Sequence, residues 1–152
     1  MAEPTLAREG NLRFASLPSR GYPLDPQGLA AQVLHLLEGQ EIEPYGPTCI
    51  FFNLPPESEP LDLCECQVGT AITGLGRSRG ALVVEDYRGL VALSLPHPGP
   101  IKELPQTWRR LAEAAAAREE PTRPYWRVAL RTPRLADGNL LPLAEVSVFL
   151  DR

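Results

Sequence analysis

The sequence predicts an α+β domain built from two tandem copies of a strand-helix-strand-strand unit (βαββ), with antiparallel sheets and two helices on one face. Three observations support this prediction: the chain matches itself at a fixed offset, each half carries one apolar stripe at helical spacing, and two strand-like segments follow each stripe. A single domain is expected over residues 1–152, with repeat 1 at 11–68, a linker at 69–80 and repeat 2 at 81–150.

The internal repeat appears when the sequence is shifted by 78 residues. Residues 11–18 read NLRFASLP and residues 89–96 read GLVALSLP; Gly21 then falls on Gly99. Farther along, CIFFNLP from Cys49 aligns with RVALRTP from Arg127, and LCEC at 63–66 meets LAEV at 143–146 after a loop two residues longer. Several matches in the same order indicate a duplication, with each copy as one supersecondary unit.

Each copy is expected to contain one amphipathic helix, over residues 26–38 and 102–118. Asp25 followed by Pro26 is typical of a helix start, because the aspartate caps free amide groups and proline at the first position needs no amide proton. Apolar residues then recur at helical spacing on one face of each segment. They are Leu29, Val33, Leu36 and Leu37 in the first helix and Leu104, Trp108, Leu111 and Ala115 in the second.

Two further strands close each copy, 48–54 with 61–68 and 125–132 with 141–150. The second connection contains Asp137-Gly138-Asn139, a strong turn signal, and both pairs are expected to be antiparallel hairpins. Since side chains alternate across a strand, one set should pack under the helices. That set is Ile50, Phe52, Leu54, Cys64, Cys66 and Val68, with Val128, Leu130, Val146, Val148 and Leu150.

The opposite face of the hairpins is mixed in character. A turn near residue 136 or 137 would place Arg127 directly opposite Glu145 on this face. Two interpretations remain open: an exposed cross-strand ion pair worth about 0 to 1 kcal/mol, or a fixed polar pair on the wall of a binding cleft.

Composition excludes several classes of function. The net charge is -4 and the basic residues are scattered, which argues against direct nucleic-acid binding. No apolar run approaches the roughly 20 residues that span a bilayer, and the first ten residues lack the core of a signal peptide, so we expect no membrane partner and a cytoplasmic location. Cys49, Cys64 and Cys66 are expected to be small core residues, and no metal site is predicted. His97 is expected in a loop.

Residues 99–111, GPIKELPQTWRRL, resemble the segment that opens the second helix in GyrI-like small-molecule-binding domains. These include the effector-binding domains of multidrug-responsive transcription activators and the gyrase-inhibitory protein. Residues 126–130 and 144–148 lie where that family has its last two strands, so the resemblance covers residues 11–150. It implies two halves packed about a pseudo-twofold axis, with a groove between them for amphipathic and often cationic molecules.

The chain departs from that family at two positions of the penultimate strand. The family has a glutamate there and, two residues later, a tyrosine; this chain has Arg127 and Ala129. An arginine would repel a cation, so the ligand is expected to be neutral or anionic, or the groove vestigial. Some relatives hydrolyse strained electrophiles with that glutamate. Its loss makes hydrolysis less expected than binding, and no catalytic residue or cofactor is predicted.

The preferred interpretation is a stand-alone, regulatory small-molecule-binding domain whose ligand is hydrophobic or amphipathic. The candidate ligand-binding residues are Tyr45, Phe51, Glu65, Tyr125, Arg127 and Glu145. Ten leading residues leave no room for a DNA-reading domain, so any DNA contact would come from a partner. The alternatives are a protein-protein regulator that resembles the gyrase inhibitor, and a hydrolase with a non-standard acid-base residue.

Overall fold

The computed structural model describes residues 3–57, 60–131, 135–136, 139–140 and 144–152, and it has the predicted α+β class. The order βαββ occurs twice along the chain, and a short β6–β7 hairpin is inserted between β5 and β8. The elements are β1 (Thr5–Arg20), α1 (Pro26–Leu36), β2 (Ile42–Phe52), β3 (Glu65–Gly74), β4 (Val83–His97), a 3-10 turn (Ile101–Glu103), α2 (Leu104–Ala117), β5 (Thr122–Leu130), β6 (Leu135–Ala136), β7 (Asn139–Leu140) and β8 (Ala144–Leu150).

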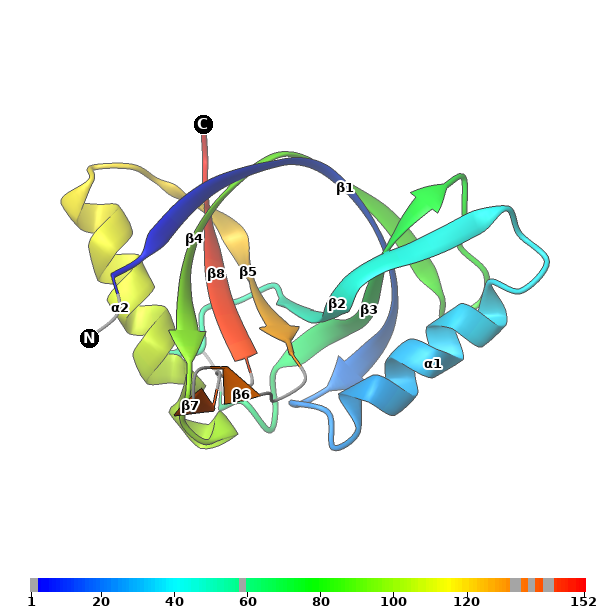
Figure 1. Ribbon diagram of the computed structural model, residues 1–152, viewed down its shortest axis with the longest axis horizontal. Coiled ribbons are helices and arrows are strands. Elements are labelled where there is room, and N and C mark those ends of the chain that lie inside the picture. Colours follow the sequence, from blue (N-terminus) through cyan, green and yellow to red (C-terminus); the bar gives the residue numbers. More distant parts are fainter. Residues whose placement is uncertain (1–2, 58–59, 132–134, 137–138, 141–143) are drawn as a thin grey trace.

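The six long strands form a closed antiparallel barrel in the order β1-β3-β2-β5-β8-β4 (Figure 1). Corresponding strands of the two halves pair with each other: β1 with β4, and β2 with β5. At the second of these seams Ile50 pairs with Val128, and Cys49 pairs with Ala129. Ile50 and Val128 are 78 residues apart, so they occupy the same position in the two proposed repeats. A twofold axis between the repeats requires such an equivalent pair at the seam.

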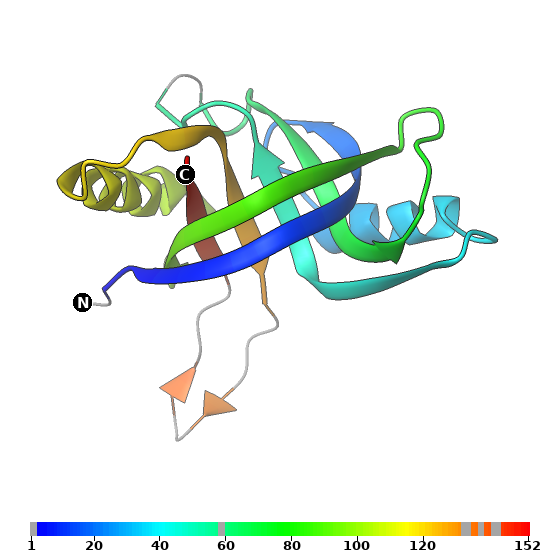
Figure 2. The ribbon, with the colours of Figure 1, turned by 90° about the horizontal axis from the view of Figure 1, so that it is seen from above.

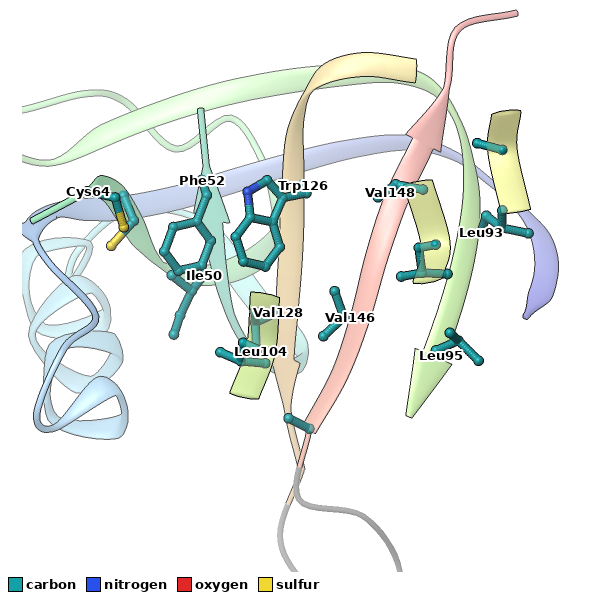
Figure 3. Packing of buried hydrophobic residues seen from close by; sticks show 14 of the residues in the cluster. Ile50, Phe52, Cys64, Leu93, Leu95, Leu104, Trp126, Val128, Val146 and Val148 are labelled. Carbon is teal, nitrogen blue, oxygen red and sulfur yellow. The ribbon is translucent and has the colours of Figure 1, made fainter. Parts of the chain in front are cut away.

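Both helices lie against the outer face of the barrel, α1 at one end and α2 at the other (Figure 1). The outer cluster of buried apolar residues runs from β3 and β2 across β5, β8 and β4 to α2 (Figure 3). It contains nearly all of the predicted helix-facing set, from Ile50 and Phe52 to Val146, Val148 and Leu150. Leu54 is the exception, because it follows the end of β2 and is 51% exposed. Alternation along the strands therefore predicted the helix-covered face correctly.

The start of each helix is held by a different interaction. The side chain of Asp25 accepts a hydrogen bond from the Gly28 amide at 3.0 Å, as the predicted cap requires. At α2, His97 fixes the preceding turn, because its ring nitrogens lie 2.7 Å from Thr107 Oγ1 and 2.8 Å from the Pro100 carbonyl oxygen. The expectation that His97 lies in a loop is wrong: it is the last residue of β4 and is 3% exposed.

Strand boundaries depart from the prediction most where the two halves meet. β1 and β4 are 16 and 15 residues long and run side by side across both halves (Figure 2), because each pairs with its counterpart as well as with its own copy. Residues 69–74, predicted as linker, belong to β3. The predicted turn at Asp137-Gly138-Asn139 lies partly outside the described residues, although Ala136 pairs with Asn139. No helix in the described part of the chain is long and apolar enough to cross a membrane.

Candidate functional site

The inside of the barrel is packed mainly with aromatic side chains. This inner cluster consists of Phe14, Cys49, Phe51, Leu90, Ala92, Ala129 and Phe149, with Leu12, Tyr87 and Tyr125 partly buried against it. Phe51 lies at its centre, with ring centroids 4.6 Å from Tyr87 and 4.8 Å from Phe14. Burial raises the pKa of Tyr87, so this phenol stays neutral and serves as packing.

Beside the inner cluster, a cavity of about 210 Å³ opens where β2 meets β5. We call it the seam cavity, because residues from both halves line it. Its apolar wall includes Phe14 and Ala71 from the first half and Ala129 from the second. The full lining is Glu9, Leu12, Phe14, Tyr45, Gly46, Pro47, Cys49, Ala71, Arg127, Ala129, Arg131 and Glu145.

One ion pair of the lining joins a buried arginine to a partly exposed glutamate. Arg127 Nη1 donates to Glu9 Oε1 at 2.6 Å and Nη2 donates to Oε2 at 2.7 Å, a bidentate arrangement. Nη2 also donates to Ser147 Oγ at 3.1 Å, and the guanidinium lies 5.1 Å from the centroid of the Phe149 ring. Burial acts to lower the pKa of Arg127, but the hydrogen bonds and charge of Glu9 outweigh it and raise that pKa. Arg127 is therefore charged and neutralised by Glu9.

A second, looser pair lines the outer end of the cavity. Arg131 Nη2 and Glu145 Oε1 are 3.6 Å apart, and their side chains are 57% and 33% exposed. The predicted pairing of Arg127 with Glu145 is wrong. Arg127 lies opposite Ser147, and Glu145 lies opposite Ala129. Ala136 pairs with Asn139, so the hairpin is centred about one residue later than predicted, and each residue of β5 faces a residue two positions farther along β8.

Cys49 lies in the cavity wall between the two ion pairs. Burial raises the pKa of its thiol to about 11. The nearby charges act in opposition, because Arg127 and Arg131 lower this pKa whereas Glu9 and Glu145 raise it. The thiol is therefore neutral and serves as part of the wall.

The structure distributes the six predicted ligand-binding residues over three places. Tyr45, Arg127 and Glu145 line the seam cavity. Phe51 and Tyr125 lie in the inner cluster and pack against its other rings. Glu65 is exposed at the first position of β3, opposite Arg20, and does not line the cavity.

Glu9 and Arg131 line the cavity but were not predicted as site residues. Glu9 precedes the segment that was expected to form the first strand, and nothing in the local pattern signals that β1 begins at Thr5. Arg131 lines the cavity from just beyond the last residue of β5, and the family resemblance pointed to Arg127 and Ala129 instead. Glu9 could be found only once β1 was known to pair with β4.

A larger depression, of about 660 Å³, lies at the far end of the β2–β3 hairpin. It is lined mostly by exposed residues of the first half, including Leu75, Arg77 and Arg79. The seam cavity is the better candidate, because it joins both halves and combines an apolar wall with buried polar groups. Within the described residues, no group of three or more His, Cys, Asp or Glu side chains could hold a metal ion.

Comparisons with solved structures reveal similar folds at low sequence identity. The C-terminal domain of EcmrR has a TM-score of 0.73 and 10% identity, and the match covers 99% of this chain and 98% of that one. In an EcmrR–DNA complex the match covers 97% of this chain but 56% of the whole EcmrR chain (TM-score 0.72, 12% identity), so this chain spans about half of that protein.

Two further neighbours have the same fold. A hydrolase from Listeria innocua has a TM-score of 0.61 and 12% identity over 97% of this chain and 90% of that one. A protein solved with tetraphenylphosphonium bound has a TM-score of 0.57 and 10% identity over 99% of this chain and 94% of that one. No family model matches the sequence. No curated protein matches it either.

Proposed function

The chain has the GyrI-like fold, and on that premise we propose that it is a cytoplasmic small-molecule-binding domain with a regulatory role. The observation that carries the proposal is the seam cavity, in which an apolar wall from both halves meets two ion pairs. Fold neighbours that include a DNA-bound protein and a protein bound to an organic ion add support.

The charges of the cavity favour a hydrophobic or amphipathic ligand that is neutral or anionic. A bound cation needs a carboxylate to offset the loss of its hydration. Both lining carboxylates already face arginines, Glu9 at 2.6 Å and Glu145 at 3.6 Å. The sequence-based expectation of a neutral or anionic ligand relied on repulsion of a cation by Arg127. In the structure Arg127 is neutralised by Glu9, so the expected preference relies on the engaged carboxylates instead.

A thermal-shift screen with neutral, anionic and cationic amphiphiles tests the proposal, since a ligand that binds only the folded state raises the melting temperature. Ala129→Leu should fill part of the cavity and weaken any hit, because Ala129 lies in its wall with 4% exposure. Ala116→Leu makes the same change at an exposed position of α2 and should leave the shift intact. The proposal fails if no compound shifts the wild type at about 1 mM, or if both variants respond alike.

The filled interior of the barrel favours a second candidate, a protein-protein regulator that acts through its surface. The inner cluster packs aromatic side chains inside the barrel, and the seam cavity beside it has only about 210 Å³ for a ligand. If the chain acts through its surface, Ala129→Leu should leave the regulation of a partner unchanged. If regulation depends on a ligand in the cavity, the same variant should lose its response to that ligand.

Hydrolysis is less favoured, because Glu9 and Glu145 would each have to leave an arginine before activating a water molecule. Turnover of an ester or strained substrate that is abolished by Glu145→Gln would make hydrolysis the favoured function.

A further inference from the structure

The two ion pairs of the seam cavity differ in how firmly they are closed. In the inner pair both guanidinium Nη atoms of Arg127 bind both oxygens of Glu9, and the Arg127 side chain is 8% exposed. Opening it would leave a buried charge without a partner, which is strongly unfavourable. The inner pair therefore remains closed when a ligand enters.

The outer pair, Arg131 with Glu145, can exchange its partner for a ligand more easily. Its closest atoms are 3.6 Å apart, beyond a good hydrogen bond, and the Arg131 side chain is 57% exposed. Such pairs contribute little to stability. Arg131 also follows the last residue of β5, whereas Glu145 lies within β8, between β5 and β4. Arg131 is thus the partner whose side chain can turn toward a ligand.

The lining also contains more hydrogen-bond donors than its acceptors use. Arg127 Nε is buried and has no hydrogen-bond partner among the described residues, even though both Nη atoms are engaged. Arg131 adds further donors, because its 3.6 Å contact with Glu145 leaves them without a close acceptor in that pair. Surplus donors on two arginines favour a ligand that carries an acceptor with negative charge.

The volume of the cavity limits the apolar part of that ligand. An apolar cavity of about 150 Å³ accepts benzene in another protein. The seam cavity, at about 210 Å³, therefore fits one ring with a short polar arm. Its apolar wall, with Phe14 and Ala129, would contact the ring, while Arg131 lies at the more exposed end.

We propose that the seam cavity binds a small aromatic or similarly sized apolar carboxylate, and that Arg131 releases Glu145 to hold the ligand's carboxylate in a bidentate contact. This inference rests on the proposed function and deepens it. Arg131 becomes the residue that determines the charge preference, and Arg127 with Glu9 becomes a fixed part of the wall.

Three ligands of similar shape test the proposal by isothermal titration calorimetry: phenylacetate, neutral phenylacetamide and cationic phenethylamine. Wild type should bind phenylacetate about tenfold more tightly than phenylacetamide, the range expected for a hydrogen bond to a charged group, and phenethylamine most weakly. Arg131→Gln should reduce phenylacetate affinity to that of phenylacetamide, and Arg131→Lys should retain part of the difference.

Arg109→Gln is the matched control, because Arg109 forms an exposed pair with Glu57 on the outer face and should leave all three affinities unchanged. The inference is overturned if phenylacetate and phenylacetamide bind equally, if Arg131→Gln leaves phenylacetate affinity intact, or if none of the three binds at about 10 mM. The proposed function is tested separately, because it fails only if the wider amphiphile screen also finds no ligand sensitive to Ala129→Leu.

Discussion

At the scale of single residues, the Arg127–Glu9 pair should matter far more to stability than any other ion pair described above. Glu9→Gln leaves the Arg127 charge buried without its partner, although water can reach the site because Glu9 is 29% exposed. We expect a loss of about 2–3 kcal/mol in the free energy of unfolding, below the range for fully buried pairs. Urea denaturation measures it.

Glu57→Gln provides the comparison, because Glu57 makes a 2.8 Å contact with Arg109 in which both side chains are about half exposed. That change should cost less than about 1 kcal/mol. Equal losses for the two variants would show that Arg127 depends on Glu9 no more than the exposed Arg109 depends on Glu57.

Cys49 should resist alkylation at neutral pH. Its raised pKa of about 11 means that the folded state retains the thiol proton, and about one molecule in a thousand carries the reactive thiolate at pH 8. The rate of modification by iodoacetamide, followed by peptide mass spectrometry, should rise about tenfold per pH unit up to about pH 11. Protein unfolded in urea is the control. A Cys49 that reacts equally fast folded and unfolded at pH 8 would contradict the burial of the cavity wall.

At the scale of elements, Gly69 explains why β3 was underestimated from the sequence. Glycine suggested a linker, but here it allows β1 and β3 to approach, since a Cβ atom would lie 1.8 Å from the Ala15 carbonyl oxygen. Gly69→Ala should therefore cost about 3 kcal/mol or more in the free energy of unfolding, measured in urea.

Gly80→Ala is the control for that substitution. Gly80 has φ +60° and no atom within 4 Å of the added Cβ, so backbone strain of about 1–2 kcal/mol is the whole expected cost. If Gly69→Ala costs no more than Gly80→Ala, the close approach of the strands is not present in solution.

The sequence allowed the elements to be predicted better than their ends. Periodicity identified both helices and the face they cover, because burial under a helix imposes a pattern on adjacent residues. The lengths of β1 and β4 could not be read in this way, since their extra residues pair across the two halves. The β5–β8 register differed by two residues, which preserves the alternation, so Arg127 and Glu145 were still predicted on the correct face.

At the scale of the whole molecule, the closed barrel should make the two halves unfold together. β1 pairs with β4 and β2 with β5, so neither half completes its sheet alone. Calorimetry should give one transition whose calorimetric and van't Hoff enthalpies agree. Two separated transitions, one for each proposed repeat, would show that the seams contribute little to stability.

The candidate site forms only when distant parts of the chain meet, which is why it could be predicted only in part from the sequence. Arg127 and Glu145, which line the cavity, were expected on the mixed strand face, whereas Tyr45 precedes the strand expected to begin at residue 48. Glu9 was missed because it reaches Arg127 only after the chain has closed on itself, 118 residues away. Phe51 and Tyr125 lie in the inner cluster beside the cavity and are not among the residues that line it.

Amide chemical-shift mapping can show whether a small molecule occupies the cavity between the two halves. In titrations with phenylacetate and phenylacetamide, we predict that the largest shifts in the ¹H–¹⁵N spectrum fall on Cys49, Ala71 and Ala129, which line the cavity from both halves. Shifts confined to residues 75–79, beside the larger surface depression, or no shifts at all at about 10 mM ligand, would show that the seam cavity is not a binding site for these compounds.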